Sequence, residues 1–399
     1  KQPIQSILDG AKSHGCEVIG MSGLLVKSTL IMRDNLLEMN ERGLHTYPVL
    51  LGGAALTRAY VEEDLRSQYK GSVWYAQDAF EGLRLMEQIG TEPQAPRKLP
   101  SDTPRPRSHR IDEASRELYV YTGAKSDVEP LPSPPQPPFL GVRSMDRFDI
   151  QEIYRYINPV ALFRGQWQFR REKGMDNPTF DAWLAENAVP IFERMKRELA
   201  RLFKPKVRWG YFECLSEGND LIVYHEDRRT ERLRFTFPRQ RDGRRLCISD
   251  FFLAKEDAPG GVMDTVAFQI VTVGNEITLH ERALFDAGEF QDYLFVHGMG
   301  VETAEALAEY WHRQIRYEMG IADTEPEQMK ALFGAKYRGA RYSFGYPACP
   351  NLEDQAKLFE LLGPEEIGIE LTEEFMLVPE QSTSAIVVHH PEAKYFNIR

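Results

Sequence analysis

The sequence predicts an α/β unit with a doubly wound parallel sheet, followed by a larger α+β unit with an antiparallel sheet. Three observations support this. Short apolar runs alternate with helix-like segments in residues 1–90, prolines crowd residues 91–145, and residues 146–399 hold strand-like runs between amphipathic helices. The length of 399 residues is typical of two or three domains.

The first unit contains three strand candidates, and a helix candidate follows each of them. The strand candidates are residues 18–22, 47–51 and 72–75, and helical spacing of apolar residues covers 28–42, 55–68 and a segment from about residue 79. Strands that alternate with helices at this spacing indicate a Rossmann-like parallel sheet.

Residues 91–145 have a different composition. Eleven of the 25 prolines lie between residues 93 and 138. Such a segment cannot build a core of its own, so we predict an extended linker between two domains that move, or a strap across a surface.

The second unit, residues 146–399, combines helices with strands. One long amphipathic helix is expected over residues 181–204, and another with one apolar face over 301–319. Strands are expected at four places, and the last of them, which alternates only weakly, is typical of an inner strand. These strands are residues 207–213, 219–225, 234–237 and 265–272.

Composition and charge exclude several classes of function. The net charge of −11 disfavours a nucleic-acid partner, and no apolar run approaches the roughly 20 residues that span a bilayer. No signal peptide is visible, and the four cysteines lack zinc-site spacing. We therefore expect no metal site, no membrane contact and a cytoplasmic location.

Small residues follow each strand of the first unit. The three loops begin at Ser22, Gly52 and Gln77. In a doubly wound sheet, ligands bind outside the carboxyl ends of the strands, and small residues leave backbone donors accessible there. Because GxGxxG, a P-loop lysine and an acidic ribose ligand are all missing, NAD and ATP are disfavoured. A simple tight turn at Gly52-Gly53 remains an alternative.

The segment Arg341-Tyr-Ser-Phe-Gly-Tyr-Pro-Ala-Cys-Pro350 is the most unusual stretch of the chain. Its prolines exclude a regular helix or a central strand. Gly345 can take a positive φ, Arg341 is a planar cation suited to carboxylates, and the tyrosines offer flat faces. This combination suits a small zwitterionic ligand with a flat ring, and a proline-rich structural turn is the alternative.

These motifs resemble the cobalamin-dependent methionine synthase family. Residues 19–25 (IGMSGLL), 50–54 (LLGGA) and 73–79 (VWYAQDA) are similar to the second half of its cobalamin-binding domain. RYSFGYPACP resembles the signature of its activation domain, which binds S-adenosylmethionine. Residues 308–316 (AEYWHRQIR) and 390–396 (HPEAKYF) also resemble that family.

The resemblance implies that the first unit holds the nucleotide tail of cobalamin, as in methylcobalamin. The lining residues would be Ser22, Gly52, Gly53, Ala54 and Ala79, whereas Val26 stands where relatives often have threonine. The family's Asp-x-His-x-x-Gly motif, which supplies the cobalt-ligating histidine, is missing, and His14 is no credible substitute. We therefore expect a fragment that at best holds cobalamin incompletely.

For the second unit the resemblance implies an S-adenosylmethionine site. Arg341 would bind the carboxylate of the ligand, and Asn158, an aspartate in some relatives, its amine. Glu305 matches a carboxylate near the corrin. The other residues of the implied site are Gly345, Tyr346, Pro347, Ala348, Tyr395 and Phe396.

Structural roles remain open for several of these residues. Arg341 could form a surface salt bridge, Tyr395 could serve packing, and Glu305 and His312 could lie on an exposed helix face. Trp167 is expected in the core, and Cys349 is expected to be a packing residue.

The function that the resemblance implies is reductive methylation of oxidised cobalamin by S-adenosylmethionine. This repair serves methyl transfer from methyltetrahydrofolate to homocysteine in methionine biosynthesis. The expected partners are flavodoxin or a flavoprotein reductase and the upstream domains of the enzyme, and zinc would belong only to the missing homocysteine domain. A non-enzymatic cobalamin sensor or carrier is the alternative, and an inert fragment is a second one.

Overall fold

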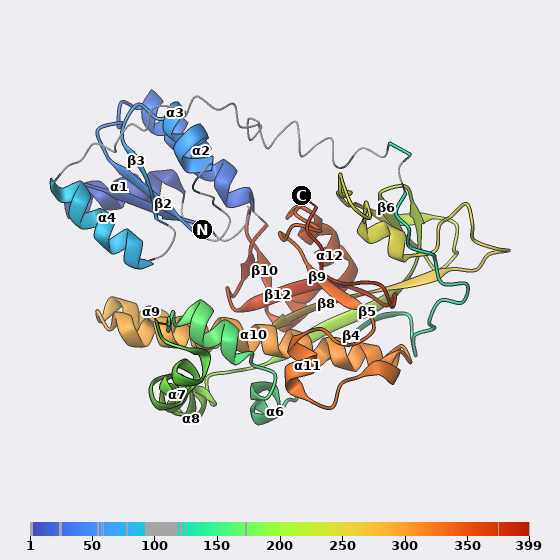
Figure 1. The fold of residues 1–399 in the computed structure, drawn as a ribbon. Coiled ribbons are helices and arrows are strands. Elements are labelled where there is room, and N and C mark those ends of the chain that lie inside the picture. Colours follow the sequence, from blue (N-terminus) through green and yellow to red (C-terminus); the bar gives the residue numbers. More distant parts are fainter. Residues whose placement is uncertain are drawn as a thin grey trace. The chain divides into compact units, whose positions relative to one another are not determined.

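The structure is a computed structural model with two compact units (Figure 1). Unit 1 comprises Lys1–Glu117 with Gly345–Pro350, and unit 2 comprises Leu118–Phe344 with Asn351–Arg399. The first boundary thus falls inside the predicted linker. The residues that the structure describes are 3–23, 26–53, 56, 58, 60–76, 79–91, 119, 122–123, 125–171, 174–373 and 375–398.

Unit 1 is built on a three-stranded parallel sheet in the order β1-β2-β3. The strands are β1 (Ile19–Ser22), β2 (Val49–Gly52) and β3 (Val73–Ala76). The register aligns Ser22 with Gly52 and Gly52 with Ala76, so all three strands end at one edge. The parallel pairing predicted from the alternating pattern is therefore present.

Helices cover both faces of this sheet. Leu36 of α2 and Val61 of η1 belong to the core cluster that includes Val49 and Val73. On the opposite face, a Cβ added at Gly82 of α4 would lie 3.7 Å from the Ala76 Cβ. The helices of unit 1 are α1 (Ile4–His14), α2 (Val26–Glu41), η1 (Tyr60–Leu65), α3 (Arg66–Gln68) and α4 (Ala79–Thr91).

Unit 2 is built on a seven-stranded antiparallel sheet. Its path is β7-β6-β5-β8-β12-β9, and β4 pairs with β5. Every residue of β8 is buried, which confirms the predicted inner strand. The strands are β4 (Gly141–Met145), β5 (Lys206–Glu217), β6 (Asp220–Tyr224), β7 (Glu231–Thr236), β8 (Asp264–Thr272), β9 (Ala340–Ser343) and β12 (Ser382–Val388). A separate pair joins β10 (Glu370–Leu371) to β11 (Leu377–Val378).

Helices form layers on both sides of this sheet. The long helix α10 contacts β8 and β12, whereas α12 contacts β5 and β8 from the other side (Figure 1). The helices are α6 (Ile150–Tyr154), η2 (Ala161–Gln166), α7 (Asn177–Asn187), α8 (Val189–Leu199), η3 (Ile248–Phe251), α9 (Glu276–Asp286), α10 (Phe290–Glu318), η4 (Ala322–Thr324), α11 (Met329–Phe333), α12 (Asp354–Leu362) and η5 (Pro364–Ile367).

Two predicted segments differ from the structure. The single helix over residues 181–204 is wrong: the chain forms α7 and α8, which meet at the buried residue Ala188. Pro190 lies in the first turn of α8, and because proline donates no backbone hydrogen bond, it favours a new helix start over an uninterrupted helix. Residues 141–145, predicted as linker, instead form β4 and pair with β5.

The described part of the proline-rich segment lies as a strap along unit 2. Asp127 pairs with Arg244 at 2.7 Å, and the Glu129 carbonyl oxygen lies 2.9 Å from His390 Nε2. These contacts favour the strap interpretation for residues 125–138. Within the described residues, no helix combines the length and apolar character that crossing a membrane requires.

The core of unit 2 fixes α10 against the sheet. Trp311 of α10 meets Trp209 of β5 edge-on, with ring centroids 4.4 Å apart. Gln269 of β8 donates from Nε2 to the Ala308 carbonyl oxygen at 2.9 Å. Burial of each large apolar side chain contributes roughly 1.5–3 kcal/mol, so α10 is a rigid platform for the polar residues that it carries.

Candidate functional site

A row of polar residues follows one face of α10. Glu302, Glu305, Glu309, His312 and Arg316 are spaced alternately by three and four residues, which places them on one side of a helix. Such a row can contact several charged side chains at once, and one of these side chains comes from strand β9.

Arg341 on β9 connects the sheet to this row. Its Nη2 donates to Glu305 Oε2 at 2.9 Å, and its Nε donates to Glu309 Oε2 at 3.3 Å. The two carboxylates raise the pKa of Arg341, against the lowering effect of burial. The side chain is 19% exposed, so this is a half-buried ion pair rather than the surface salt bridge considered from the sequence.

Glu309 lies deeper than Glu305. Its Oε2 accepts from the Tyr337 hydroxyl at 3.3 Å, and Arg316 Nη1 lies 3.7 Å from its Oε1. Burial favours the neutral acid, but contact with His312 and the cations Arg341 and Arg316 lower the pKa of Glu309 to about 2. Glu309 therefore stays ionised, and it holds both cations in place.

His312 is completely buried, so an exposed helix face is excluded for it. Its ring meets Tyr337 edge-on at 5.4 Å, and neither ring nitrogen has a hydrogen-bond partner within the described residues. Burial and the Arg316 cation lower its pKa to about 4, which keeps the imidazole neutral. Neutral His312 lies 3.9 Å from Glu309, so at neutral pH Arg341 and Arg316 are the charged groups that face this carboxylate.

The segment after β9 folds into a tight turn. Gly345 adopts φ +92°, as its sequence context predicts, and its N–H donates to the Cys349 carbonyl oxygen at 2.9 Å. The Cys349 N–H donates to the Tyr346 carbonyl oxygen at 3.0 Å, with Pro347 as the second residue of the turn. Ala348 is buried, whereas the Tyr346 ring is 42% exposed, so the turn presents one aromatic face.

The segment around residue 395 is tied to β9. The hydroxyl of Tyr342, the neighbour of Arg341, donates to the Lys394 carbonyl oxygen at 2.8 Å. Phe396 is buried and meets Tyr342 edge-on at 5.8 Å, whereas Tyr395 is 60% exposed. Phe396 therefore packs against β9, and Tyr395 is accessible to solvent.

Asn158 lies between α6 and η2. Its Oδ1 accepts from the Val160 N–H at 3.0 Å, and its carbonyl oxygen accepts from the Leu162 N–H at 3.0 Å. One lone pair of the side-chain oxygen is thus used in starting η2. Trp167, at the other end of η2, is a core residue as expected and donates from Nε1 to the Phe295 carbonyl oxygen at 3.1 Å.

Sequence reasoning missed Glu302. This carboxyl is 7% exposed, and its Oε1 accepts from Gln166 Nε2 at 3.2 Å. Burial and the nearby Glu305 raise its pKa to about 7, against the opposing effects of Gln166 and Arg341. Its position three residues before Glu305, facing the same side of the helix, was a signal that could have revealed it.

In unit 1 the predicted small residues meet at the sheet edge. A Cβ added at Gly53, which has φ +108°, would lie 2.2 Å from the Gly23 carbonyl oxygen. The loops after β1 and β2 therefore approach too closely for any residue but glycine at this position. Ser22 at the end of β1 is exposed. Val26 and Ala79 are the first residues of α2 and α4, and Ala54 lies outside the described residues.

Metal ligands do not gather anywhere in the described part of the chain. No group of three or more His, Cys, Asp or Glu side chains there could hold a metal ion. His14 is exposed on α1, and its Nδ1 lies 3.0 Å from the Gly10 carbonyl oxygen of the same helix.

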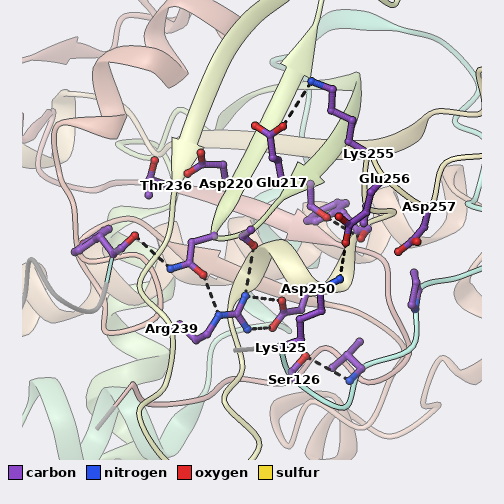
Figure 2. A pocket seen from close by; sticks show the side chains of 18 residues that line it. Lys125, Ser126, Glu217, Asp220, Thr236, Arg239, Asp250, Lys255, Glu256 and Asp257 are labelled. Atoms are coloured by element: carbon purple, nitrogen blue, oxygen red, sulfur yellow. Dashed lines mark hydrogen bonds and ion pairs between the residues drawn. The ribbon is translucent and has the colours of Figure 1, made fainter. Parts of the chain in front are cut away.

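A separate cavity of about 660 Å³ lies beside β5 and β6 in unit 2 (Figure 2). Its buried cation, Arg239, faces Asp250 with two hydrogen bonds of 2.6 and 2.7 Å. Its Nε also donates to Asn219 Oδ1 at 2.9 Å. The guanidinium is therefore used structurally, and the cavity contains none of the residues predicted from the sequence.

Comparisons with known proteins agree on one family. The family model "Vitamin B12 dependent methionine synthase, activation domain" matches residues 149–399. Methionine synthases of Mycobacterium tuberculosis and Mycobacterium leprae are each 44% identical over the whole chain, which spans 36% of their length. A solved structure, "Crystal Structure of the MetH Reactivation Domain bound to AdoHcy", aligns with TM-score 0.58 and 25% identity, over 72% of this chain and 88% of that one.

Proposed function

This chain belongs to the vitamin B12-dependent methionine synthase family through its activation domain, and we propose that residues 149–399 bind S-adenosylmethionine to reactivate cobalamin. The observation that carries the proposal is the ion pair of Arg341 with Glu305 at 2.9 Å, within a family-model match that also covers the Gly345–Ala348 turn. A solved relative was crystallised with S-adenosylhomocysteine, the product left when S-adenosylmethionine loses its methyl group.

The charges around Arg341 support this ligand. S-adenosylmethionine carries a sulfonium, an ammonium and a carboxylate, so its net charge is positive. Glu305 and Glu309 already neutralise Arg341, and a positively charged ligand suits such a carboxylate-rich surface. The guanidinium uses Nε and Nη2 in these ion pairs, which leaves Nη1 as a donor for the carboxylate of the ligand.

The other proposed residues offer aromatic faces, a hydrogen-bond acceptor or support for the backbone. The exposed Tyr346 and Tyr395 rings offer faces to a sulfonium or an adenine. The second lone pair of Asn158 Oδ1 can accept from the ammonium. Gly345, Pro347 and Ala348 hold the backbone turn, and Phe396 stabilises the segment that presents Tyr395.

We further propose that residues 1–90 are a Rossmann-like cobalamin-binding unit, followed by the linker and the activation domain of residues 146–399. The exposed Ser22 and the small residues at the aligned strand ends suit the nucleotide tail of cobalamin. Cobalamin, when bound, supplies the cobalt that receives the methyl group after reduction by a flavodoxin-like donor. The role of this chain is to orient the sulfonium methyl group and to exclude water.

For the whole protein we propose methyl transfer from methyltetrahydrofolate to homocysteine. The chain spans about a third of the length of the curated relatives, so this activity is proposed for the whole protein and not for this chain alone. The family match disfavours the alternative of a non-enzymatic cobalamin sensor.

Isothermal titration of the full chain with S-adenosylmethionine tests the proposed site. Arg341→Lys keeps the charge but loses the planar fork, and we expect binding to weaken at least about tenfold, equivalent to roughly 1.4 kcal/mol. Arg194→Lys is the matched control, because it changes an ion pair of 2.8 Å to Asp292 in the first turn of α10. No binding by the wild type, or equal binding by Arg341→Lys, would contradict the proposal.

A further inference from the structure

Glu302 occupies a junction between two parts of the proposed site. It lies one helical turn before Glu305, the carboxylate that binds Arg341 at 2.9 Å. On its other side it accepts from Gln166, the last residue of η2, at 3.2 Å. A single buried carboxyl thus faces both the Arg341 cluster and the end of η2.

The element η2 is held closely on α10. A Cβ added at Gly298 would lie 2.7 Å from the Gln166 Cβ and 2.9 Å from Trp167 Cδ1. The indole of Trp167 is fixed to the Phe295 carbonyl oxygen at 3.1 Å. This close seating holds the Cβ of Gln166 against α10, so its hydrogen bond to Glu302 helps to fix η2, whose first turn is started by Asn158.

The groups that face Glu302 come from three elements. From α10 it faces the carboxylate of Glu305, from β9 the cation of Arg341, and from η2 the uncharged amide of Gln166. Burial raises the pKa of Glu302 to about 7, so its neutral and ionised forms are both populated near neutral pH. A charge added nearby shifts the balance between them.

We propose that Glu302 is a positioning residue of the S-adenosylmethionine site, and that it loses its proton when the cationic ligand binds beside Arg341. This inference rests on the function proposed above. The net positive charge of the ligand favours the carboxylate form of Glu302. The hydrogen bond from Gln166 then becomes charge-assisted and stronger, which fixes η2 and Asn158 more firmly on α10 while the ligand is bound.

Calorimetric titration of the full chain with S-adenosylmethionine, in two buffers of different ionisation enthalpy at pH 7, measures the protons released. We expect the wild type to release up to about half a proton, since Glu302 is about half protonated at that pH. Its Kd should fall several-fold between pH 6 and pH 8. Glu302→Gln keeps the hydrogen-bonding shape without a titrating proton, so both effects should disappear.

Two controls separate this effect from general damage. Glu281→Gln changes a second buried carboxyl that accepts from a glutamine, Gln381, at 2.9 Å, and it should leave the proton release unchanged. S-adenosylhomocysteine lacks the sulfonium charge, and it should release fewer protons than S-adenosylmethionine from the same protein.

Gln166→Leu provides a second test of the inference if Glu302→Gln misfolds. This substitution removes the hydrogen bond that lowers the pKa of Glu302, so the midpoint of the pH dependence of Kd should move to higher pH. Proton release by Glu302→Gln equal to that of the wild type, or an unmoved midpoint in Gln166→Leu, would overturn the inference. Failure of the wild type to bind S-adenosylmethionine would instead overturn the proposed function.

Discussion

Arg341 on β9 and Glu305 on α10 form a half-buried ion pair, with Nη2 and Oε2 2.9 Å apart. The pair joins the edge strand of the sheet to the long helix α10. The proposed ligand would bind beside this pair, through Arg341 Nη1, which takes no part in the ion pairs with Glu305 and Glu309.

The two carboxylates that hold Arg341 should differ in their contribution to stability. Glu305 is 37% exposed, so Glu305→Gln should lower the free energy of unfolding by less than about 1 kcal/mol. Glu309 is only 13% exposed and also faces Arg316, so Glu309→Gln should lower the free energy of unfolding by about 3 kcal/mol at pH 7. Urea unfolding of both variants measures the difference, and equal costs would contradict the assignment of Glu309 as the central anion.

The stabilisation by Glu309 should depend on pH in a defined direction. Its pKa is lowered from 4.5 to about 2, so the stabilisation is present above pH 4.5 and is lost as pH falls through 2. The change corresponds to about 3 kcal/mol. The difference in unfolding free energy between wild type and Glu309→Gln should therefore shrink below pH 4.5. A constant difference would contradict a lowered pKa of Glu309 in the folded protein.

Glu302 should show the opposite dependence, because burial raises its pKa from 4.5 to about 7. The folded protein holds this proton more tightly than the unfolded chain, so wild-type stability falls as pH rises from 4.5 to 7. Relative to wild type, the free energy of unfolding of Glu302→Gln should rise by up to about 3 kcal/mol between pH 4.5 and pH 7. Thermal unfolding at several pH values without ligand measures the gain.

Gly298 should be essential for seating η2 on α10. Gly298→Ala would push a methyl group against Gln166 and Trp167, which typically costs about 1–3 kcal/mol and should weaken S-adenosylmethionine binding. Gly165→Ala is the matched control, because a Cβ there would meet no atom within 4 Å. Tryptophan fluorescence and calorimetry report the two effects, and similar behaviour of both variants would refute the role of Gly298.

Gly53 should be irreplaceable in unit 1. Its φ of +108° and the Gly23 carbonyl oxygen 2.2 Å from an added Cβ both exclude a side chain, so Gly53→Ala should destabilise unit 1 by more than about 2 kcal/mol. Gly43 also has a positive φ, +71°, but meets no atom within 4 Å, so Gly43→Ala should cost only about 1 kcal/mol. Hydrogen exchange in β1 and β2 distinguishes the two variants.

Much of the fold could be predicted from local pattern. Short apolar runs between helix-like segments located β1, β2 and β3 to within one or two residues, because the residues of a parallel strand that face the core must be apolar. The break between α7 and α8 was missed, although Pro190 signals it, because apolar spacing continues across the break. The short strand β9 could not be predicted, since its pairing with β12 depends on residues more than forty positions away.

The sequence by itself determined the family, the Gly345 turn and the presence of Arg341 in a carboxylate-rich chain, because these depend on residue identity and local conformation. Only the tertiary structure decided that Glu305 and Glu309 hold Arg341, that His312 is buried, and that Glu302 lies between η2 and the ion pair. Burial and electrostatic environment arise when distant elements pack together, so no spacing along the chain can give them.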